Sequence, residues 1–305
     1  MAATLYNQVD SNRRKTILLM IGFSFFIVLV SYILVRALGF DGAGALGFSG
    51  LFLVISGLIN LGSYYWSDKL VLGLTGGRQI EKEDSPKLFR IIENLSIAAG
   101  SPMPKIFVIE DPAPNAFATG RDPRHAVVAF TTGLLEKLDN LEIEGVAAHE
   151  LSHIRNYDTR LMSIIVILVG MLIFLVDIFS RSLWWGNFGK NKRETGGGLF
   201  LVLGVFVAIL APILAQVIKF AISRRREFLA DASGALLTRH PEGLAKALIK
   251  ISQDKNTLRS ASNATAHLYI ENPFKGEKAK NWFINLFSTH PPVEDRVKAL
   301  RVVSL

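Results

Sequence analysis

The segment His149-Glu150-Leu-Ser-His153 places two imidazoles four residues apart, with a carboxylate beside the first. On a helix, residues i and i+4 lie on one face, so both rings can reach one metal ion at about 2.0–2.1 Å. Glu150 then lies beside the ion, where a carboxylate can take a proton from metal-activated water and later give it to a leaving amine. The chain has six histidines and no cysteine, so a metal site must use His, Asp and Glu. This pattern indicates zinc-dependent hydrolysis.

A catalytic zinc site needs a third protein ligand and keeps its fourth position open. Among the acidic residues that follow, Asp158 is too near in sequence to turn back to the face that presents His153, whereas Glu227 lies on a later predicted helix. Asp231 follows one turn after Glu227 on the same face, where it could accept the free N–H of a ligating imidazole. The alternative is that these two carboxylates only neutralise the neighbouring cations at residues 224–226.

Four apolar segments of membrane-spanning length interrupt the chain, at residues 16–34, 44–66, 161–180 and 199–217. The first follows Arg13-Arg14-Lys15, which favours an uncleaved anchor and a cytoplasmic N-terminus. The last two segments could instead form a shallow hairpin or buried helices, because cations at residues 190–193 lie in the loop between them. If both segments cross the membrane, the chain returns to the side that it left, so that His153 and Glu227 lie on the same side. Both residues must lie on one side to bind the same ion.

The segments between the apolar pairs have the mixed composition of a globular domain. Their pattern predicts a helix over residues 85–99 and strands at 105–110 and 125–131. Asp139, followed three residues later by Glu142, is typical of a capped helix start, and the helix that begins there carries both histidines.

The chain of 305 residues has a formal net charge of +8, and 50% of its residues are hydrophobic. A basic balance can reflect a nucleic acid partner, an anionic membrane surface or the cytoplasmic flanks of membrane helices. Here the cations cluster beside the apolar segments and are not interleaved with aromatic residues. The sequence therefore argues against a nucleic acid partner.

Five short motifs match a pattern known from other proteins. They lie at residues 102–105, 114–120, 149–153, 226–231 and 289–292. With the two N-terminal apolar segments, they resemble the HtpX-type integral-membrane zinc metalloproteases, which are related to the CAAX prenyl proteases. The resemblance implies a mainly helical α+β fold, in which a gluzincin-like metalloprotease domain with a small sheet is attached to about four transmembrane helices.

The same resemblance divides the chain into five parts. These are a cytoplasmic N-terminus (1–15), a transmembrane hairpin (16–66), the first part of the protease domain with the paired histidines (67–160), a second hydrophobic pair (161–220) and the second part of the protease domain with the third zinc ligand (221–305). The protease domain would then be assembled from two segments on the cytoplasmic side.

The resemblance also implies the ligands of a single Zn²⁺ ion. They are His149, His153 and Glu227, with Glu150 as the catalytic base. These residues are the ones that the spacing of the sequence singles out, so the two lines of reasoning agree on the metal site.

Further roles come from the resemblance alone. Asn115 and Ala116 would lie on an edge strand that binds the substrate backbone, and His290 would stabilise the oxyanion of the tetrahedral intermediate. Arg296 would brace Asp231. From the residues themselves, Asn115 could be an ordinary turn residue after a proline, and His290 a helix-entry residue before two prolines.

The expected function is that of a multi-pass protease of the cell (inner) membrane. It would hydrolyse polypeptides, such as misfolded or damaged membrane proteins, at the cytoplasmic face; the sequence does not determine the oligomeric state. A metal-ion transporter and a non-catalytic membrane scaffold are the alternatives. Too many charges lie on the histidine helix for a lipid-embedded ion path, and a structural zinc site would have no use for Glu150.

Overall fold

The computed structural model describes residues 5–37, 40–165, 197–261, 265, 268–273 and 290–302. The helices within them are α1 (Leu5–Ala37), α2 (Gly42–Thr75), α3 (Pro86–Ala99), α4 (Thr132–Lys137), α5 (Asn140–Arg155), α7 (Gly197–Thr238), α8 (Pro241–Gln253) and α11 (Val293–Val302), with a 3-10 helix, η1 (Pro123–His125). The strands are β1 (Arg78–Gln79), β2 (Lys105–Ile109), β3 (Ala116–Thr119) and β4 (Val127–Thr131). A mainly helical fold with a small sheet is therefore confirmed.

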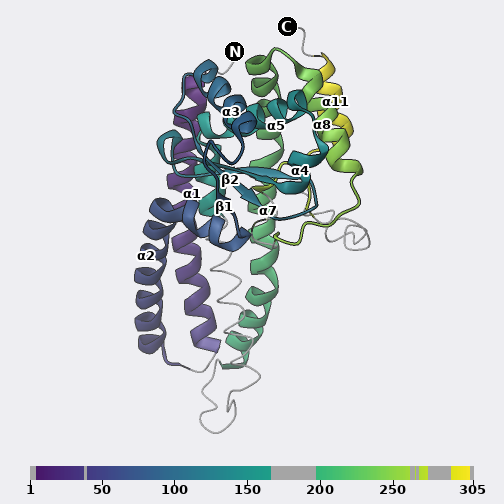
Figure 1. Ribbon diagram of the computed structural model, residues 1–305. Coiled ribbons are helices and arrows are strands. Elements are labelled where there is room, and N and C mark those ends of the chain that lie inside the picture. The colour runs from purple at the N-terminus through teal and green to yellow at the C-terminus, as the bar shows by residue number, and fades with distance from the viewer. Residues whose placement is uncertain are drawn as a thin grey trace.

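These elements form a globular head on a helical stalk (Figure 1). The lower parts of α1, α2 and α7 make up the stalk, and α1 packs against both of the other two helices. The sheet and the remaining helices lie in the head. Helix α7 runs from the stalk into the head without interruption, so it connects the two parts.

The first two predicted membrane segments lie in α1 and α2, and both helices are longer than those segments. α2 departs from helical geometry at Trp66 (φ −121°, ψ 18°), where the predicted segment ends, and then continues to Thr75. Gly76 ends it with a left-handed φ of 68°, a conformation that glycine adopts without strain. Among the described residues, Gly42–Trp66 is long and apolar enough to cross a bilayer (mean hydropathy 1.9), and Met20–Arg36 is a shorter apolar helix.

The second pair of apolar segments is described in part. Of residues 161–180, only the first five are described; all five are buried, and Leu161, Ile164 and Ile165 form a cluster with Phe23 and Ile27 of α1. Residues 199–217 are helical and lie within α7. The cations at residues 190–193 lie outside the described residues. A full crossing by this pair therefore stays a prediction.

The sheet has the strand order β1-β2-β4-β3. Its centre is the parallel pair β2 and β4, and β1 and β3 are antiparallel edge strands. The two central strands are rich in β-branched and aromatic residues, and every residue of β4 is buried. Both correspond to predicted strands. β3 begins directly after Asn115, so Asn115 and Ala116 lie at the start of an edge strand.

The helix that carries both histidines, α5, is enclosed by the rest of the head. Asp139 accepts a hydrogen bond from the Glu142 N–H at 3.0 Å, and Glu142 accepts one from the Asp139 N–H at 2.9 Å, which confirms the capped start. Strands β3 and β4 and helices α3, α7 and α8 pack around α5. The contact with α8 is close because it contains a glycine: a Cβ on Gly145 would lie 2.5 Å from the Leu244 backbone nitrogen.

Replacing Gly145 by alanine tests how much this close approach supports the head. The added Cβ would meet the Leu244 backbone, which cannot move aside as a flexible side chain can. We expect Gly145→Ala to lower the free energy of unfolding by about 1–3 kcal/mol, the usual cost of overpacking, in unfolding experiments in detergent. Gly22→Ala is the matched control, since no atom lies within 4 Å of its Cβ. Unchanged stability of Gly145→Ala would contradict the expectation.

Candidate metal centre

Two helices bring three metal-binding side chains together. His149 and His153, one turn apart on α5, have their Nε2 atoms 3.2 Å apart, with the two rings at 89° to each other. From α7, Glu227 places Oε1 3.4 Å from His153 Nε2 and Oε2 3.7 Å from His149 Nε2. The three residues predicted as ligands therefore meet, although 74 residues separate His153 from Glu227.

The spacing of these atoms fits one zinc ion. At zinc-to-ligand distances of about 2.0–2.1 Å, neighbouring ligand atoms of a tetrahedron lie about 3.3–3.4 Å apart. The two ring nitrogens lie 3.2 Å apart, His153 Nε2 lies 3.4 Å from Glu227 Oε1, and His149 Nε2 lies 3.7 Å from the other carboxylate oxygen, Oε2. A shared cation would stabilise the two ring nitrogens at such a short distance. Three protein ligands of this kind leave the fourth position open, as a catalytic site requires.

A glycine allows α7 to reach α5. Gly234, Asp231 and Glu227 are spaced by three and four residues, so they share one face of α7. A Cβ on Gly234 would lie 3.0 Å from His149 N and 3.2 Å from its Cα, which is tighter than most real contacts. Because Gly234 has no side chain, the backbones of the two helices approach closely. The carboxylates one and two turns earlier on α7 then face the histidines.

Asp231 connects the site to a buried arginine. His149 Nδ1 lies 2.9 Å from Asp231 Oδ1, and Arg296 from α11 donates to both oxygens of Asp231, at 2.7 and 2.8 Å. Burial alone would raise the pKa of Asp231, but the Arg296 guanidinium outweighs it and lowers the pKa to about 2. Asp231 is therefore charged and sets the orientation of the His149 ring, and Arg296 lies where it can brace Asp231.

Asp158 is a partner of His153 that the sequence reasoning set aside. His153 Nδ1 lies 3.2 Å from Asp158 Oδ2, on the opposite side of the ring from Nε2. The chain turns back at Tyr157, whose φ of 58° is left-handed, and this turn brings Asp158 to the histidine. Burial would lower the pKa of His153, but Asp158 and Glu227 outweigh burial and raise it well above its usual value. The assumption that Asp158 could not reach His153 was wrong, although Asp158 meets the nitrogen that does not face Glu227.

Glu150 follows His149 on α5 and is only 2% exposed. Burial is the main reason why its pKa is raised to about 8, with His153 and the Ala118 backbone N–H of β3 acting in the opposite direction. A carboxylate with a raised pKa near the metal ligands has the proton affinity of a general base. A nearby divalent cation would stabilise its charged form.

His290 lies directly before the prolines that lead into α11, and it points to a metal ligand. Its Nδ1 is 3.0 Å from Glu227 Oε2. Burial would raise the pKa of Glu227, but His290 and then His153 outweigh burial and hold it well below its usual range. The structure therefore places His290 where it can orient Glu227, and its role toward an oxyanion stays a prediction.

The outer edge of β3 is occupied by the chain itself. Asn115 Nδ2 donates to the Glu271 carbonyl oxygen at 3.0 Å, and the Ala116 carbonyl accepts a hydrogen bond from the Ile270 N–H at 2.9 Å. The outward-facing groups of the two residues predicted to bind substrate thus already have partners within the chain.

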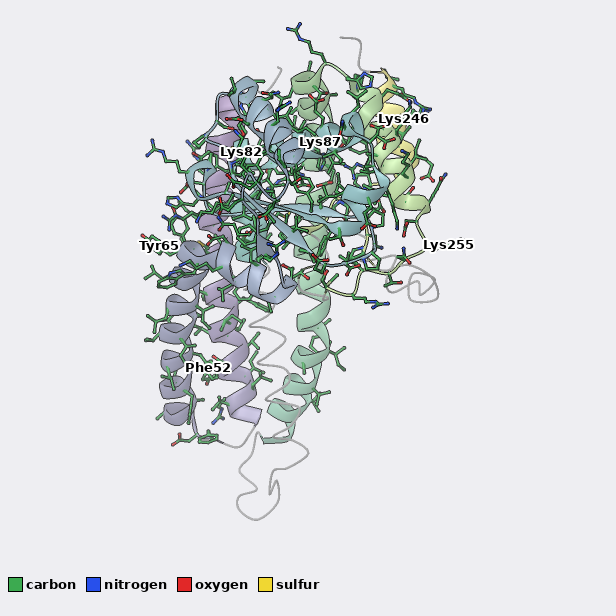
Figure 2. All side chains as sticks on the ribbon, in the orientation of Figure 1. Phe52, Tyr65, Lys82, Lys87, Lys246 and Lys255 are labelled. Carbon is green, nitrogen blue, oxygen red and sulfur yellow. The ribbon has the colours of Figure 1, made fainter. Side chains whose placement is uncertain are left out.

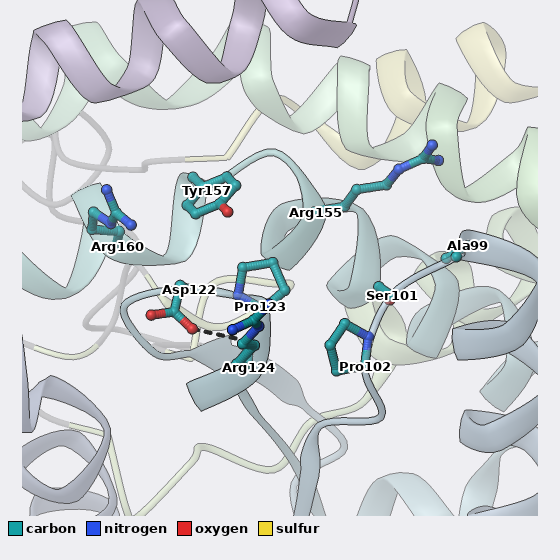
Figure 3. Close-up of a pocket in the computed structure, with 10 residues that line it drawn as sticks. Ala99, Ser101, Pro102, Asp122, Pro123, Arg124, Arg155, Tyr157 and Arg160 are labelled. Atoms are coloured by element: carbon teal, nitrogen blue, oxygen red, sulfur yellow. Dashed lines mark hydrogen bonds between the residues drawn. The ribbon is translucent and has the colours of Figure 1, made fainter.

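An open pocket elsewhere in the head is separate from the metal centre (Figure 3). It lies between the end of α3, the segment around η1 and the end of α5. Asp122 in its wall accepts a hydrogen bond from the Arg124 N–H at 2.9 Å. Figure 3 shows the Arg155 and Arg160 side chains pointing away from each other, so these cations do not converge on one ligand position.

Comparisons with known proteins agree with this geometry. The sequence model of peptidase family M48 matches residues 82–304. A protease HtpX homolog from Dictyoglomus thermophilum is 45% identical over 300 residues, which cover 98% of this chain and 95% of the relative. Another from Caldanaerobacter subterraneus is 43% identical over 305 residues, or 99% of each chain.

The crystal structure of S. mikatae Ste24p has a similar fold. The TM-score is 0.50 and the sequence identity is 22%, with 95% of this chain and 65% of the Ste24p chain covered. At this identity the similarity concerns the fold alone. It shows that the head and the long helices of this chain follow an arrangement found in a solved structure.

A helix-borne histidine pair completed by a carboxylate from a later helix, within this fold, defines a metalloprotease. Within that class, the chain belongs to peptidase family M48, and its relatives over nearly the full length are HtpX proteases. The family resemblance inferred from the five sequence motifs is therefore confirmed.

Replacing Asp158 by asparagine tests its contact with His153. The amide keeps the shape of the side chain but loses the charge that orients and polarises the imidazole. We expect zinc affinity to fall by about 10–100-fold, the usual effect of losing such a partner, measured by competition with a chelator. Asp122→Asn is the control, because Asp122 contacts surface residues of the η1 segment and no proposed ligand. Equal zinc affinity of the two variants would remove Asp158 from the site.

Proposed function

We propose that this metalloprotease is a zinc-dependent endopeptidase of the cell membrane that cleaves misfolded or damaged membrane proteins at the cytoplasmic face. The observation that carries the proposal is the meeting of His149, His153 and Glu227, with the buried Glu150 next to them on α5. Zinc is the ion that fits two imidazoles, one carboxylate and an open position.

Each residue of the site then has a task in peptide hydrolysis. Zinc, when bound, acts as a Lewis acid that polarises a carbonyl and makes water more acidic. Glu150 takes the proton of the attacking water and gives it to the leaving amine, for which its raised pKa suits it. Asp158 and Asp231 hold the two imidazoles in orientation, and His290 holds Glu227.

The surface of the stalk supports a location in the membrane. Large apolar side chains on three helices are exposed, among them Phe25 on α1 (71%), Leu58 on α2 (65%) and Phe206 on α7 (56%). In Figure 2, Phe52 lies on the stalk, whereas Lys82 and Lys246 lie on the head. A large exposed apolar surface is a mark of contact with lipid or with another protein.

The metal centre lies a short way along α7 from the apolar stalk. Ten residues separate the end of the apolar segment 199–217 from Glu227, which corresponds to about 15 Å of helix. At the boundary, the Arg121 guanidinium lies 5.2 Å from the Tyr65 ring centre, and Arg160 lies 5.4 Å from the Tyr64 ring centre. Aromatic residues and cations of this kind suit the interface between lipid and water. Polypeptides that emerge from the same membrane would thus be near the site.

The substrate class follows from the need for an extended backbone. An edge strand binds a peptide through main-chain hydrogen bonds, which a folded protein does not offer. Damaged or misfolded membrane proteins expose such segments close to the bilayer. This argument supports the proposed substrate class, and the cations at residues 13–15 support the cytoplasmic side.

Replacing Glu150 by glutamine separates catalysis from metal binding. We expect hydrolysis of casein to fall by at least about 10²–10⁴-fold, the contribution of a general base, with the zinc content unchanged. Glu144→Gln, on the same helix and partly exposed, is the matched control and should keep its activity. Full activity of Glu150→Gln, or activity of the wild type without metal, would refute the proposed chemistry.

The absence of cysteine allows a direct test of topology. Single cysteines replacing the exposed residues Lys87 and Lys246 should react with a membrane-impermeant thiol reagent only after the cell membrane is opened. A cysteine replacing the exposed Ala43, in the first turn of α2, should react in intact cells. The reverse labelling pattern would place the head outside and contradict the cytoplasmic assignment.

A further inference from the structure

The outer edge of β3 contacts a short segment of the same chain, Tyr269–Glu271, whose backbone is bent and which is not one of the four strands of the sheet. Because it lies along β3, we call it the internal strand. The Ile270 N–H donates to the Ala116 carbonyl at 2.9 Å, Asn115 Nδ2 donates to the Glu271 carbonyl at 3.0 Å, and the Glu271 N–H donates to Asn115 Oδ1 at 3.4 Å. These are the kinds of main-chain and amide contacts by which a peptide adds to the edge of a sheet.

The contacts define an antiparallel register. Asn115 faces Glu271, Ala116 faces Ile270, and the rings of Phe117 and Tyr269 meet edge to face with centres 5.1 Å apart. Ile270 belongs to the main apolar core, and Tyr269 to a second core that also contains Phe117. Tyr269 and Ile270 therefore enter different cores, and Leu268 shares the core of Tyr269. The internal strand therefore occupies groups of β3 that a bound peptide would use.

The internal strand also reaches the metal centre. Arg296 Nη1 donates to the Ile270 carbonyl oxygen at 2.9 Å and lies 3.7 Å from Glu227 Oε2. Two residues further along β3, the Ala118 backbone N–H acts to lower the pKa of the Glu150 carboxylate. A substrate strand on this edge would run beside the proposed base and the third ligand. Such a substrate would need the Ala116 carbonyl and the Asn115 amide, both of which the internal strand holds.

We propose that the internal strand Tyr269–Glu271 is a built-in competitor that occupies the substrate subsite of the resting protease and must leave β3 before a polypeptide can bind. The inference rests on the proposed function and assigns to it both a resting state and a subsite. The position of Ile270 is fully enclosed, at 1% exposure, so the subsite accepts an extended peptide with a large aliphatic residue there.

The competitor affects which substrates are cleaved. When only a fraction of the molecules is in the state that can bind substrate, the apparent affinity is the intrinsic affinity multiplied by that fraction. Tyr269 and Ile270 bury their side chains almost completely, so the closed state dominates. An unfolded segment held at high local concentration competes far better than one in solution. The competitor thus favours polypeptides anchored in the same membrane and disfavours folded soluble proteins.

A disulfide lock tests the proposal, because the chain has no other cysteine. Ala116→Cys with Ile270→Cys places two thiols on residues that a main-chain hydrogen bond of 2.9 Å joins, and a disulfide forms when their Cβ atoms come within about 3.5–4.5 Å. Oxidation should lower casein hydrolysis at least about tenfold, because the closed state can no longer open, and reductant should restore it. Each single-cysteine variant should not respond to oxidant. Equal hydrolysis by the oxidised and reduced forms, with the cross-link verified by mass spectrometry, would overturn the proposal.

A binding measurement separates this proposal from the proposed function. The same cysteine pair is combined with Glu150→Gln, and binding of fluorescently labelled casein is measured with zinc content as a parallel readout. Binding should be lost on oxidation and regained on reduction, with the zinc content constant. Redox-dependent binding without any hydrolysis by the wild type would refute the protease function and leave the competitor intact. Hydrolysis by the wild type, together with binding that does not depend on the redox state, would refute the competitor and leave the protease function intact.

A second variant tests the proposal without a cross-link. Ile270→Ala weakens the internal strand, so the open state becomes more populated and KM for casein should fall about tenfold. Leu248→Ala is the matched control, since Leu248 is a fully buried aliphatic residue of the same core on α8. It should lose stability without lowering KM. An unchanged or higher KM in Ile270→Ala would show that the internal strand is a permanent wall of the site.

Discussion

The close contact between α5 and α7 is the constraint on which the metal centre depends. Gly234 removes the side chain that would separate the two helices at His149. Once the backbones are this close, carboxylates spaced by a helical turn on α7 face imidazoles spaced by a helical turn on α5. The ligand separations that fit zinc are therefore a consequence of how two helices pack, and not of any single flexible loop.

Such a contact buries charges that would be costly alone. Carboxylates and imidazoles in a dry interior need partners, and here Asp158, Glu227, Asp231 and both imidazoles of α5 have them. Arg296 lies at the centre of this network, because it binds Asp231 through both oxygens and also donates to the Ile270 carbonyl. One guanidinium thereby joins the metal site to the edge of the sheet. A peptide that replaces the internal strand at this edge meets a site whose charges are already positioned, which limits the reorganisation needed for catalysis.

Much of this arrangement was predictable from the residues, and the failures are informative. The capped start of α5 and the pairing of His149 with His153 depend on contacts within about one helical turn, and these were predicted. The contact of Asp158 with His153 was missed, because it requires a left-handed turn at residue 157. The tyrosine at that position gives no indication of such a turn. The predicted apolar segment 44–66 ends where the apolar span of α2 ends, but the helix itself continues to Thr75, which apolarity alone does not indicate.

The sequence by itself determined the chemistry of the site: which side chains can hold zinc, which carboxylate can act as a base, and which segments are apolar enough for a bilayer. These properties follow from residue type and from spacing along one element. Only the tertiary structure decided that Glu227 meets the two imidazoles, that His290 turns toward Glu227, and that the internal strand covers the edge of β3. The reason is physical, since each of these contacts joins segments far apart in the chain, and their meeting depends on the packing of the whole head.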